Sequence, residues 1–129
     1  MLFIAINFDG TCVTHEYPEI GKDIGAVPVL KQLVEKNHKL ILFTMRCDTF
    51  KRKYLTEAIN WFKKNDIMLS GIQSNPEQKY WTDSPKAYAH LYIDDSALGC
   101  PLIYPAEKTN YPYVDWEEVE YILKDRNII

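Results

Sequence analysis

Two short apolar runs of this chain each end in side chains that carry oxygen. The first run, residues 1–6, is followed directly by the sequence Asn-Phe-Asp-Gly-Thr at residues 7–11. The second run, residues 91–93, ends in Asp94 and Asp95. Amide and carboxylate oxygens are the ligands that a hard divalent cation prefers, and such a cation can in turn hold a phosphate group. The pattern therefore predicts a metal and phosphate site, provided that the two runs are neighbouring strands.

Alternating strands and helices must position these side chains. Short apolar runs predict strands over residues 2–8, 39–43, 67–72, 91–93 and 102–104. Three-to-four spacing of apolar residues predicts helices over 26–37, 50–64 and 115–124, at most a short helix over 85–89, and loops over 12–23 and 73–83. This alternation predicts an α/β fold, a three-layer Rossmann-like parallel sheet of about five strands with helices on both faces. Ligands bind such sheets beyond the carboxyl ends of the strands.

Composition narrows the class of protein. The chain has 129 residues, of which 47% are apolar and 26% charged, which predicts a single domain over residues 1–129. The net charge of -3 argues against nucleic acid as a partner, and no apolar run is long enough to span a membrane. The opening run lacks the basic segment of a signal peptide. Three cysteines without paired spacing predict free thiols, and hence a cytoplasmic protein without a zinc site.

Residues 7–11 and the Asp94-Asp95 pair resemble the first and last motifs of the haloacid dehalogenase-like (HAD) superfamily of phosphohydrolases. The first motif is a buried strand that ends in Asp-x-Asp-Gly-Thr, and the last is a buried strand that ends in paired acids. This chain departs from the first motif at one position, where Asn7 replaces the nucleophilic aspartate. The whole chain looks like the small HAD proteins of bacteria and phages that have no cap domain. The resemblance implies a Mg²⁺-dependent phosphatase that acts on phosphate monoesters through an aspartyl-phosphate.

The resemblance also assigns catalytic roles to positions of this chain. The nucleophile position falls on Asn7, and Asp9 takes the place of the general acid that later acts as a base. Thr44, at the end of the second predicted strand, would bind a phosphoryl oxygen. The lysine that neutralises the phosphate falls on Lys86, although Lys79 lies in the same segment and is an alternative.

A Mg²⁺ cofactor is implied by the same motifs. Asp94 would hold the ion with Asp95 as a further ligand or as support, together with oxygens of Asn7 and Asp9. Oxygen ligands completed by water suit Mg²⁺ better than a fully protein-ligated calcium ion. A glycine after Asp9 would let backbone N–H groups approach a phosphate closely. The residues predicted to contact phosphate or substrate are Gly10, Thr11, His15 and Arg46, with a structural ion pair as the alternative for Arg46.

The residue at position 7 determines whether the protein can catalyse the hydrolysis of a phosphate ester. An amide oxygen can ligate Mg²⁺, but it carries no charge and is a poor nucleophile towards phosphorus. Loss of a covalent nucleophile costs on the order of 10⁴ to 10⁶ in rate, so the site is expected to bind phosphate and metal while hardly turning over. Three explanations compete: an inactivated form of an active phosphatase, a natural pseudoenzyme, or a residue that deamidates to aspartate, slowly because Phe8 follows. The first is favoured because the other groups of an active site are retained.

The intervals between the motifs leave no room for a cap domain, so the site is predicted to be open. An open site suits a large substrate, or a small one closed in by the segment 12–23 or by a second copy of the chain. The net negative charge disfavours long nucleic acid as a substrate. Nucleotides, sugar phosphates or a phosphoprotein are therefore the expected substrates, with a small phosphorylated molecule favoured. The alternative function is a non-catalytic phosphate- or nucleotide-binding pseudoenzyme. Receiver-like signalling domains also have acidic strand ends, but the Asp-Gly-Thr signature at residues 9–11 argues against that assignment.

Overall fold

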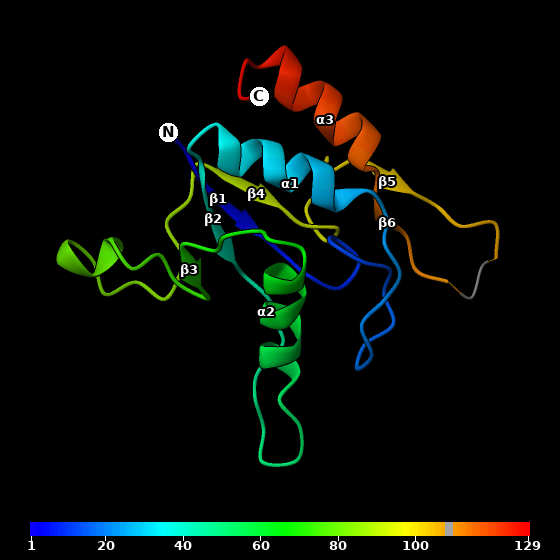
Figure 1. The fold of residues 1–129 in the computed structure, drawn as a ribbon, viewed down its shortest axis with the longest axis horizontal. Helices are drawn as coiled ribbons and strands as arrows, with labels where there is room; N and C mark the ends of the chain where they lie inside the picture. Colours follow the sequence, from blue (N-terminus) through cyan, green and yellow to red (C-terminus); the bar gives the residue numbers. More distant parts are fainter. Residues whose placement is uncertain (108–109) are drawn as a thin grey trace.

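The computed structural model describes residues 1–107 and 110–129, and it combines a parallel sheet with a small antiparallel one (Figure 1). The parallel sheet contains β1 (Phe3–Ile6), β2 (Lys39–Leu42), β3 (Gly71–Ile72) and β4 (Leu91–Ile93) in the order β3-β2-β1-β4. The helices are α1 (Ala26–Glu35), α2 (Tyr54–Lys64) and α3 (Trp116–Asp125), and a 3-10 turn, η1, spans Gln78–Tyr80. The described residues include no helix that is long and apolar enough to cross a membrane. The predicted α/β fold is confirmed.

β1 occupies the centre of the sheet because it can be buried on both faces. All four residues of its Phe-Ile-Ala-Ile sequence are buried, and the strand pairs with β2 on one side and β4 on the other. Continuous apolar runs of this kind are typical of parallel strands that are covered on both faces. Ile6 is level with Leu42 of β2 and with Ile93 of β4. This register brings the carboxyl ends of the three strands to one edge of the sheet.

The two faces of the sheet pack against different parts of the chain. The face that carries Ile4 joins a core cluster with buried residues from all three α-helices, and α1 and α3 lie side by side over it (Figure 1). The opposite face, which carries Phe3, packs against Ala87. Right-handed crossovers explain this division, because they place α1 and α2 on one face and the connection from β3 to β4 on the other. That connection, residues 73–90, contains η1 but no α-helix. α-Helices therefore cover one face of the sheet, whereas helices on both faces were predicted.

The predicted fifth strand, residues 102–104, does not join the parallel sheet. Instead, β5 (Leu102–Ile103) pairs antiparallel with β6 (Tyr113–Val114). The reason is the short connection from β4, because residues 94–101 are fewer than the dozen or so that a parallel crossover needs. The parallel sheet therefore has four strands rather than about five, and the described residues form no cap domain.

Helix α2 begins at Tyr54 rather than at the predicted residue 50. The segment before it turns back on itself through a bridge between Asp48 and Lys53, which leaves Phe50 fully exposed. The Asp48 carboxylate then accepts hydrogen bonds from the Thr56 backbone N–H at 2.9 Å and from its hydroxyl at 2.6 Å. These bonds satisfy a donor in the first turn, which a regular helix leaves open. Apolar spacing alone therefore overestimated this helix by one turn.

Helix α3 begins at Trp116, one residue after the predicted start, and Asp115 is its N-cap. The Asp115 carboxylate accepts a hydrogen bond from the backbone N–H of Glu118 at 3.2 Å. Replacing Asp115 with alanine is expected to lower the free energy of unfolding by about 1 kcal/mol, because this donor loses its partner. Urea unfolding followed by circular dichroism measures the change. Asp125→Ala at the other end of α3 is the matched control, since an acid there opposes the helix dipole, and an equal loss in both variants would contradict the cap assignment.

Candidate functional site

A hollow of about 430 Å³ lies at the edge of the sheet where β1, β2 and β4 end. β1 and β4 are neighbours, which is the condition that the predicted site required, and the backbone N–H of Asn7 extends their ladder by donating to the Ile93 carbonyl at 3.0 Å. The hollow therefore gathers side chains that are far apart in the sequence. The predicted site residues that line it are Asn7, Asp9, His15, Thr44, Arg46, Asp94 and Asp95.

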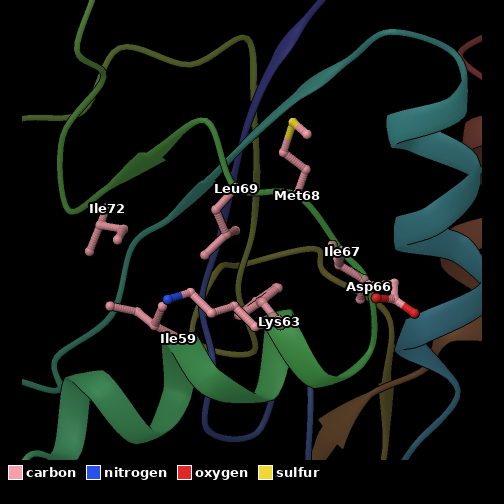
Figure 2. A pocket seen from close by; sticks show the side chains of 8 residues that line it. Ile59, Lys63, Asp66, Ile67, Met68, Leu69 and Ile72 are labelled. Atoms are coloured by element: carbon pink, nitrogen blue, oxygen red, sulfur yellow. The ribbon is translucent and has the colours of Figure 1, made fainter.

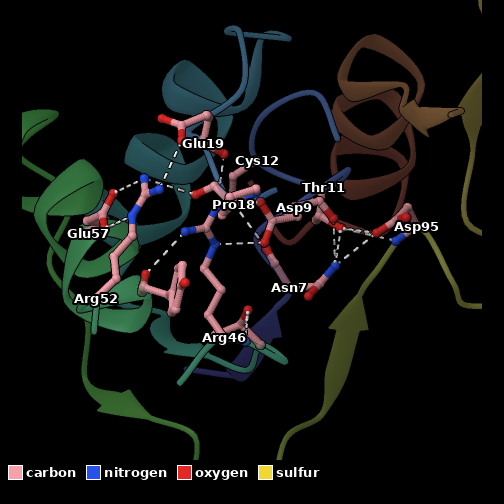
Figure 3. Close-up of polar contacts among 12 residues, drawn as sticks. Asn7, Asp9, Thr11, Cys12, Pro18, Glu19, Arg46, Arg52, Glu57 and Asp95 are labelled. Atoms are coloured by element: carbon pink, nitrogen blue, oxygen red, sulfur yellow. Dashed lines mark hydrogen bonds and ion pairs between the residues drawn. The ribbon is translucent and has the colours of Figure 1, made fainter. Parts of the chain in front are cut away.

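The side chain of Asn7 is held by its amide nitrogen, as Figure 3 shows. This nitrogen donates to Asp95 Oδ1 at 2.9 Å, to the Thr11 hydroxyl at 3.1 Å and to the Asp9 carbonyl at 3.1 Å. The Thr11 hydroxyl in turn donates to Asp95 Oδ1 at 2.9 Å. The opposite orientation of the amide would set its oxygen against the Asp95 carboxylate, so these bonds fix the amide. The Asn7 oxygen points away from them and is the atom that remains for a ligand.

Gly10 shapes the turn that follows β1. Its φ of +79° lies in the left-handed region, and a Cβ at this position would come within 2.7 Å of Asp95 Oδ2. The backbone N–H of Gly10 donates to the Val13 carbonyl at 2.9 Å, and that of Thr11 donates to the Phe8 carbonyl at 3.0 Å. These donors stabilise the turn itself. The predicted phosphate contacts of Gly10 and Thr11 stay predictions. The Thr11 hydroxyl does hold Asp95, because it donates to Asp95 Oδ1 and accepts from the Asp95 N–H.

Asp9 forms a bidentate ion pair with Arg46. The Nε and one terminal nitrogen of Arg46 each donate to an Asp9 carboxylate oxygen at 2.8 Å. Arg46 is 1% exposed and also donates to the backbone carbonyls of Glu19 and Tyr54, at 3.0 and 3.2 Å. Its guanidinium lies between two aromatic rings, those of Phe8 and Tyr17. In this structure Arg46 thus forms the structural ion pair that was the alternative to a substrate contact. Its contact with a substrate stays a prediction.

The side chains that line the hollow carry a net negative charge. Its lining includes the carboxylates of Asp9, Asp94 and Asp95, and one guanidinium, that of Arg46. Burial is the main cause that raises the pKa of Asp94 above its usual value, and the charge of Asp95 adds to it, whereas the Ser96 N–H opposes the shift. A neighbouring carboxylate that raises the proton affinity of Asp94 in this way also favours a bound cation. A phosphate would meet net negative charge here unless such a cation were present.

The donor set fits a hard cation that retains water molecules. In the part of the chain that the structure describes, no three His, Cys, Asp or Glu side chains gather into a metal cluster. The hollow instead offers the Asn7 amide oxygen beside the carboxylates of Asp94 and Asp95. Few protein oxygens completed by water and substrate are typical of Mg²⁺ sites. The Asp9 carboxylate is occupied by Arg46, so its predicted part as a ligand has no contact here to support it.

Gln73, which lies outside the predicted motifs, shapes the turn after β2. Its amide oxygen accepts from the Thr44 N–H at 2.9 Å, and its amide nitrogen donates to the carbonyls of Thr44 and Arg46 at 2.6 and 3.1 Å. The Thr44 hydroxyl accepts from the Arg46 N–H at 3.1 Å, which leaves its proton free for a ligand. No sequence signal marked this glutamine, because its effect depends on β3 lying beside β2.

No lysine lines the hollow among the described residues. The ammonium of Lys86 lies 5.6 Å from the centre of the Tyr92 ring and lines a separate hollow with Trp81 and Tyr88. The ammonium of Lys79 lies 5.3 Å from the Tyr80 ring. The role predicted for either lysine therefore stays a prediction that no contact in this structure supports.

Three lining residues fall outside the predicted set, namely Tyr17, Met45 and Ser96. Tyr17 places its ring 5.1 Å from the Arg46 guanidinium carbon, and Met45 is almost fully exposed at the rim. Ser96 supplies the backbone N–H that donates to Asp94 Oδ1 at 2.8 Å. Two of these residues could have been found from the sequence. Met45 lies between Thr44 and Arg46, and Ser96 follows the paired acids.

Another hollow, of about 470 Å³, lies between α2 and the segment that leads into β3 (Figure 2). Its lining is mainly aliphatic, with Ile59, Leu69 and Ile72 among its residues. The charged residues there, Lys63 and Asp66, offer one acid and one base rather than a set of converging oxygens. This hollow therefore lacks the groups that a metal or phosphate requires.

Comparisons with known proteins identify a structural relative but no described activity. No family model matches the sequence, and no curated protein matches it. Among solved structures, the chain is similar to the conserved protein coded by a locus from Bacteroides thetaiotaomicron. The two share 33% sequence identity with a TM-score of 0.75, over 97% of this chain and 91% of the other. The matched region therefore includes nearly the whole of this chain.

Proposed function

We propose that this chain, which belongs to the same family as the conserved protein from Bacteroides thetaiotaomicron, is a Mg²⁺-dependent phosphohydrolase of the HAD type that hardly turns over in its Asn7 form. The supporting observation is the pairing of β1 with β4, which gathers Asn7, Asp94 and Asp95 around one hollow. The substrate is a small phosphate monoester. The cytoplasm is the proposed compartment, in keeping with three cysteines that are all free.

Each group of the hollow has a task in this proposal. Asn7, Asp94 and Asp95 would hold Mg²⁺ through their side-chain oxygens. The bound ion supplies the positive charge that offsets a phosphate and polarises its oxygens. The Thr44 hydroxyl donates its free proton to a phosphoryl oxygen. In this proposal residue 7 would face the phosphorus atom, and an amide at that position would not act as the nucleophile that a carboxylate can be.

The second candidate function is a binding protein that never catalyses. The observation that favours it is the Asp9–Arg46 ion pair, because both carboxylate oxygens of Asp9 accept bonds from a buried guanidinium. A general acid must carry a proton and pass it to the leaving group. Asp9 can do so only after the approach of a substrate has loosened this pair. The two candidates therefore agree about ligand binding and differ about turnover.

Ligand binding is tested by calorimetry of the Asn7 protein with inorganic phosphate. Phosphate is expected to bind in the presence of Mg²⁺ and not after chelation of the metal. Without the metal, the net negative charge of the lining repels the phosphate. Asp94→Asn keeps the shape of the side chain and removes its charge, and it is expected to weaken Mg²⁺-dependent binding at least about tenfold. Glu117→Gln, an exposed change on α3, is the matched control. Phosphate binding that is equal with and without Mg²⁺ would contradict the proposal.

A further inference from the structure

A hollow of about 320 Å³, which we term the second hollow, adjoins the one that holds Asn7 and Asp94, which we term the first hollow. His15 lines both. One wall comes from the segment of residues 12–23, which we term the flap, and includes Glu16 and Lys22. The other wall comes from the described residues of the β5–β6 arm, which we define as β5, β6 and their connection, and includes Tyr111 and Tyr113. A molecule held in the first hollow can therefore extend past His15 into the second.

Hydrogen bonds tie both walls to the turn after β1. The Val114 N–H donates to the Gly10 carbonyl at 3.0 Å, and the indole N–H of the buried Trp116 donates to the Thr11 carbonyl at 2.6 Å. In the flap, the Val13 carbonyl accepts from the Gly10 N–H at 2.9 Å, and the Lys22 N–H donates to the Thr14 hydroxyl at 2.8 Å. The second hollow thus keeps a fixed position beside the residues that hold the metal and phosphate in the proposed function.

The lining of the second hollow offers aromatic faces beside polar groups. The rings of His15 and Tyr111 lie 5.1 Å apart at an angle of 43°, and Tyr111 is 67% exposed, so one face of its ring is open. The Glu16 carboxylate accepts from the Thr14 hydroxyl at 2.6 Å and keeps further acceptor capacity. Open aromatic faces stack on flat rings, and the polar groups around them can bind ring edges and hydroxyls.

We propose that the second hollow binds the organic part of the phosphate monoester and that this part carries a heteroaromatic ring, as a nucleoside does. The proposal rests on the proposed function, which places the phosphate in the first hollow. The volume of the second hollow falls at the lower end of the roughly 300–1,000 Å³ typical of small-molecule sites. A sugar phosphate without such a ring would leave the Tyr111 face uncovered, and it is therefore the weaker ligand.

Calorimetry of the Mg²⁺-saturated Asn7 protein tests this with three probes: adenosine 5′-monophosphate, ribose 5-phosphate and inorganic phosphate. The nucleotide is expected to bind about tenfold more tightly than ribose 5-phosphate, a typical gain from stacking one base. Tyr111→Ala should remove that preference and leave the affinity for inorganic phosphate unchanged. Tyr104→Ala is the matched control, because Tyr104 lies in the same arm, is 75% exposed against 67% for Tyr111, and lines neither hollow.

The outcomes separate this inference from the proposed function. Equal affinities for the nucleotide and ribose 5-phosphate would overturn the inference and leave the proposed function intact. So would a Tyr111→Ala variant that keeps the preference, or one that loses inorganic phosphate as well. If none of the three probes binds in the presence of Mg²⁺, the proposed function fails, and the inference fails with it.

Discussion

Replacing Asn7 with aspartate is expected to raise the rate of Mg²⁺-dependent phosphate release by at least about 10⁴-fold, since a covalent nucleophile contributes on this scale in other enzymes. The reason is chemical, because an amide oxygen lacks the negative charge that makes a carboxylate oxygen a nucleophile towards phosphorus, and it does not form the acyl-phosphate intermediate. Residue 7 follows β1 directly and lines the hollow, so the change adds a carboxylate where the proposed mechanism needs one. Release of inorganic phosphate from nucleotides, sugar phosphates and phosphopeptides is the measurement.

The same substitution should also make the stability of the protein depend on Mg²⁺. In the Asn7 protein, the amide nitrogen donates to Asp95 Oδ1 at 2.9 Å. An aspartate would place a carboxylate oxygen at this position, and two like charges so close repel each other. The Asn7→Asp variant is therefore expected to unfold at a lower temperature than the Asn7 protein after chelation of the metal, and to recover when Mg²⁺ is added. The Asn7 protein should respond less.

Asn7→Ala is the control for both measurements, because it removes the amide without adding a carboxylate. It should lose the hydrogen bonds to Thr11 and Asp95 and remain inactive. If Asn7→Asp folds and binds Mg²⁺ and phosphate but releases no more phosphate than Asn7→Ala, the phosphohydrolase proposal is wrong. The binding protein would then be the better description of this chain.

The hydrogen bonds of Asn7 also bear on the three explanations for its presence. They suit an asparagine in the absence of metal, because a carboxylate could not donate to Thr11 and Asp95. An amide held in this way, and followed by the bulky Phe8, is poorly placed for the backbone attack that deamidation requires. An inactivated phosphatase and a pseudoenzyme stay in competition, and the rate of the aspartate variant distinguishes them.

The edge of the sheet could be predicted from the sequence because its causes are local. A buried run of apolar residues that ends in polar ones marks both the strand and the position of the next side chains, as at Asn7 and Asp94. Parallel strands then bring such ends to one edge of the sheet, whereas the strand order, which apolar spacing does not give, decides which ends are neighbours. The Asp115 cap was predictable for the same reason, since a capping carboxylate and its N–H partner are close in sequence.

The parts that sequence reasoning missed depend on long-range contacts. The Asp9–Arg46 pair joins residues 37 positions apart, and nothing in either neighbourhood distinguishes an arginine aimed at a substrate from one aimed at a carboxylate. Gln73 acts on Thr44 from the end of β3, and its role becomes visible only when β3 lies beside β2. The length of α2 was overestimated because the spacing of apolar residues cannot detect the turn that Asp48 forms.

The second large effect is expected at Arg46. Replacing Arg46 with methionine, which is apolar and of similar length, should lower the free energy of unfolding by about 3–5 kcal/mol. The Asp9 side chain is only 12% exposed, so the substitution leaves its charge without a partner in a poorly hydrated place. It also removes the donors to the carbonyls of Glu19 and Tyr54, which join the flap and the start of α2 to this point. Urea unfolding in metal-free buffer measures the loss.

Arg52→Met is the matched control, because Arg52 also pairs with carboxylates, those of Glu19 and Glu57, but its side chain is 32% exposed. Exposed pairs contribute at most about 1 kcal/mol, so this variant should change little. Asp9→Asn keeps the test decisive if Arg46→Met does not fold, because it breaks the same pair from the other side. The double variant should lose less stability than the two single losses combined, since neither charge is then left alone. Losses that simply add, or an Arg46→Met loss no larger than that of Arg52→Met, would show that the buried pair does not hold this edge together.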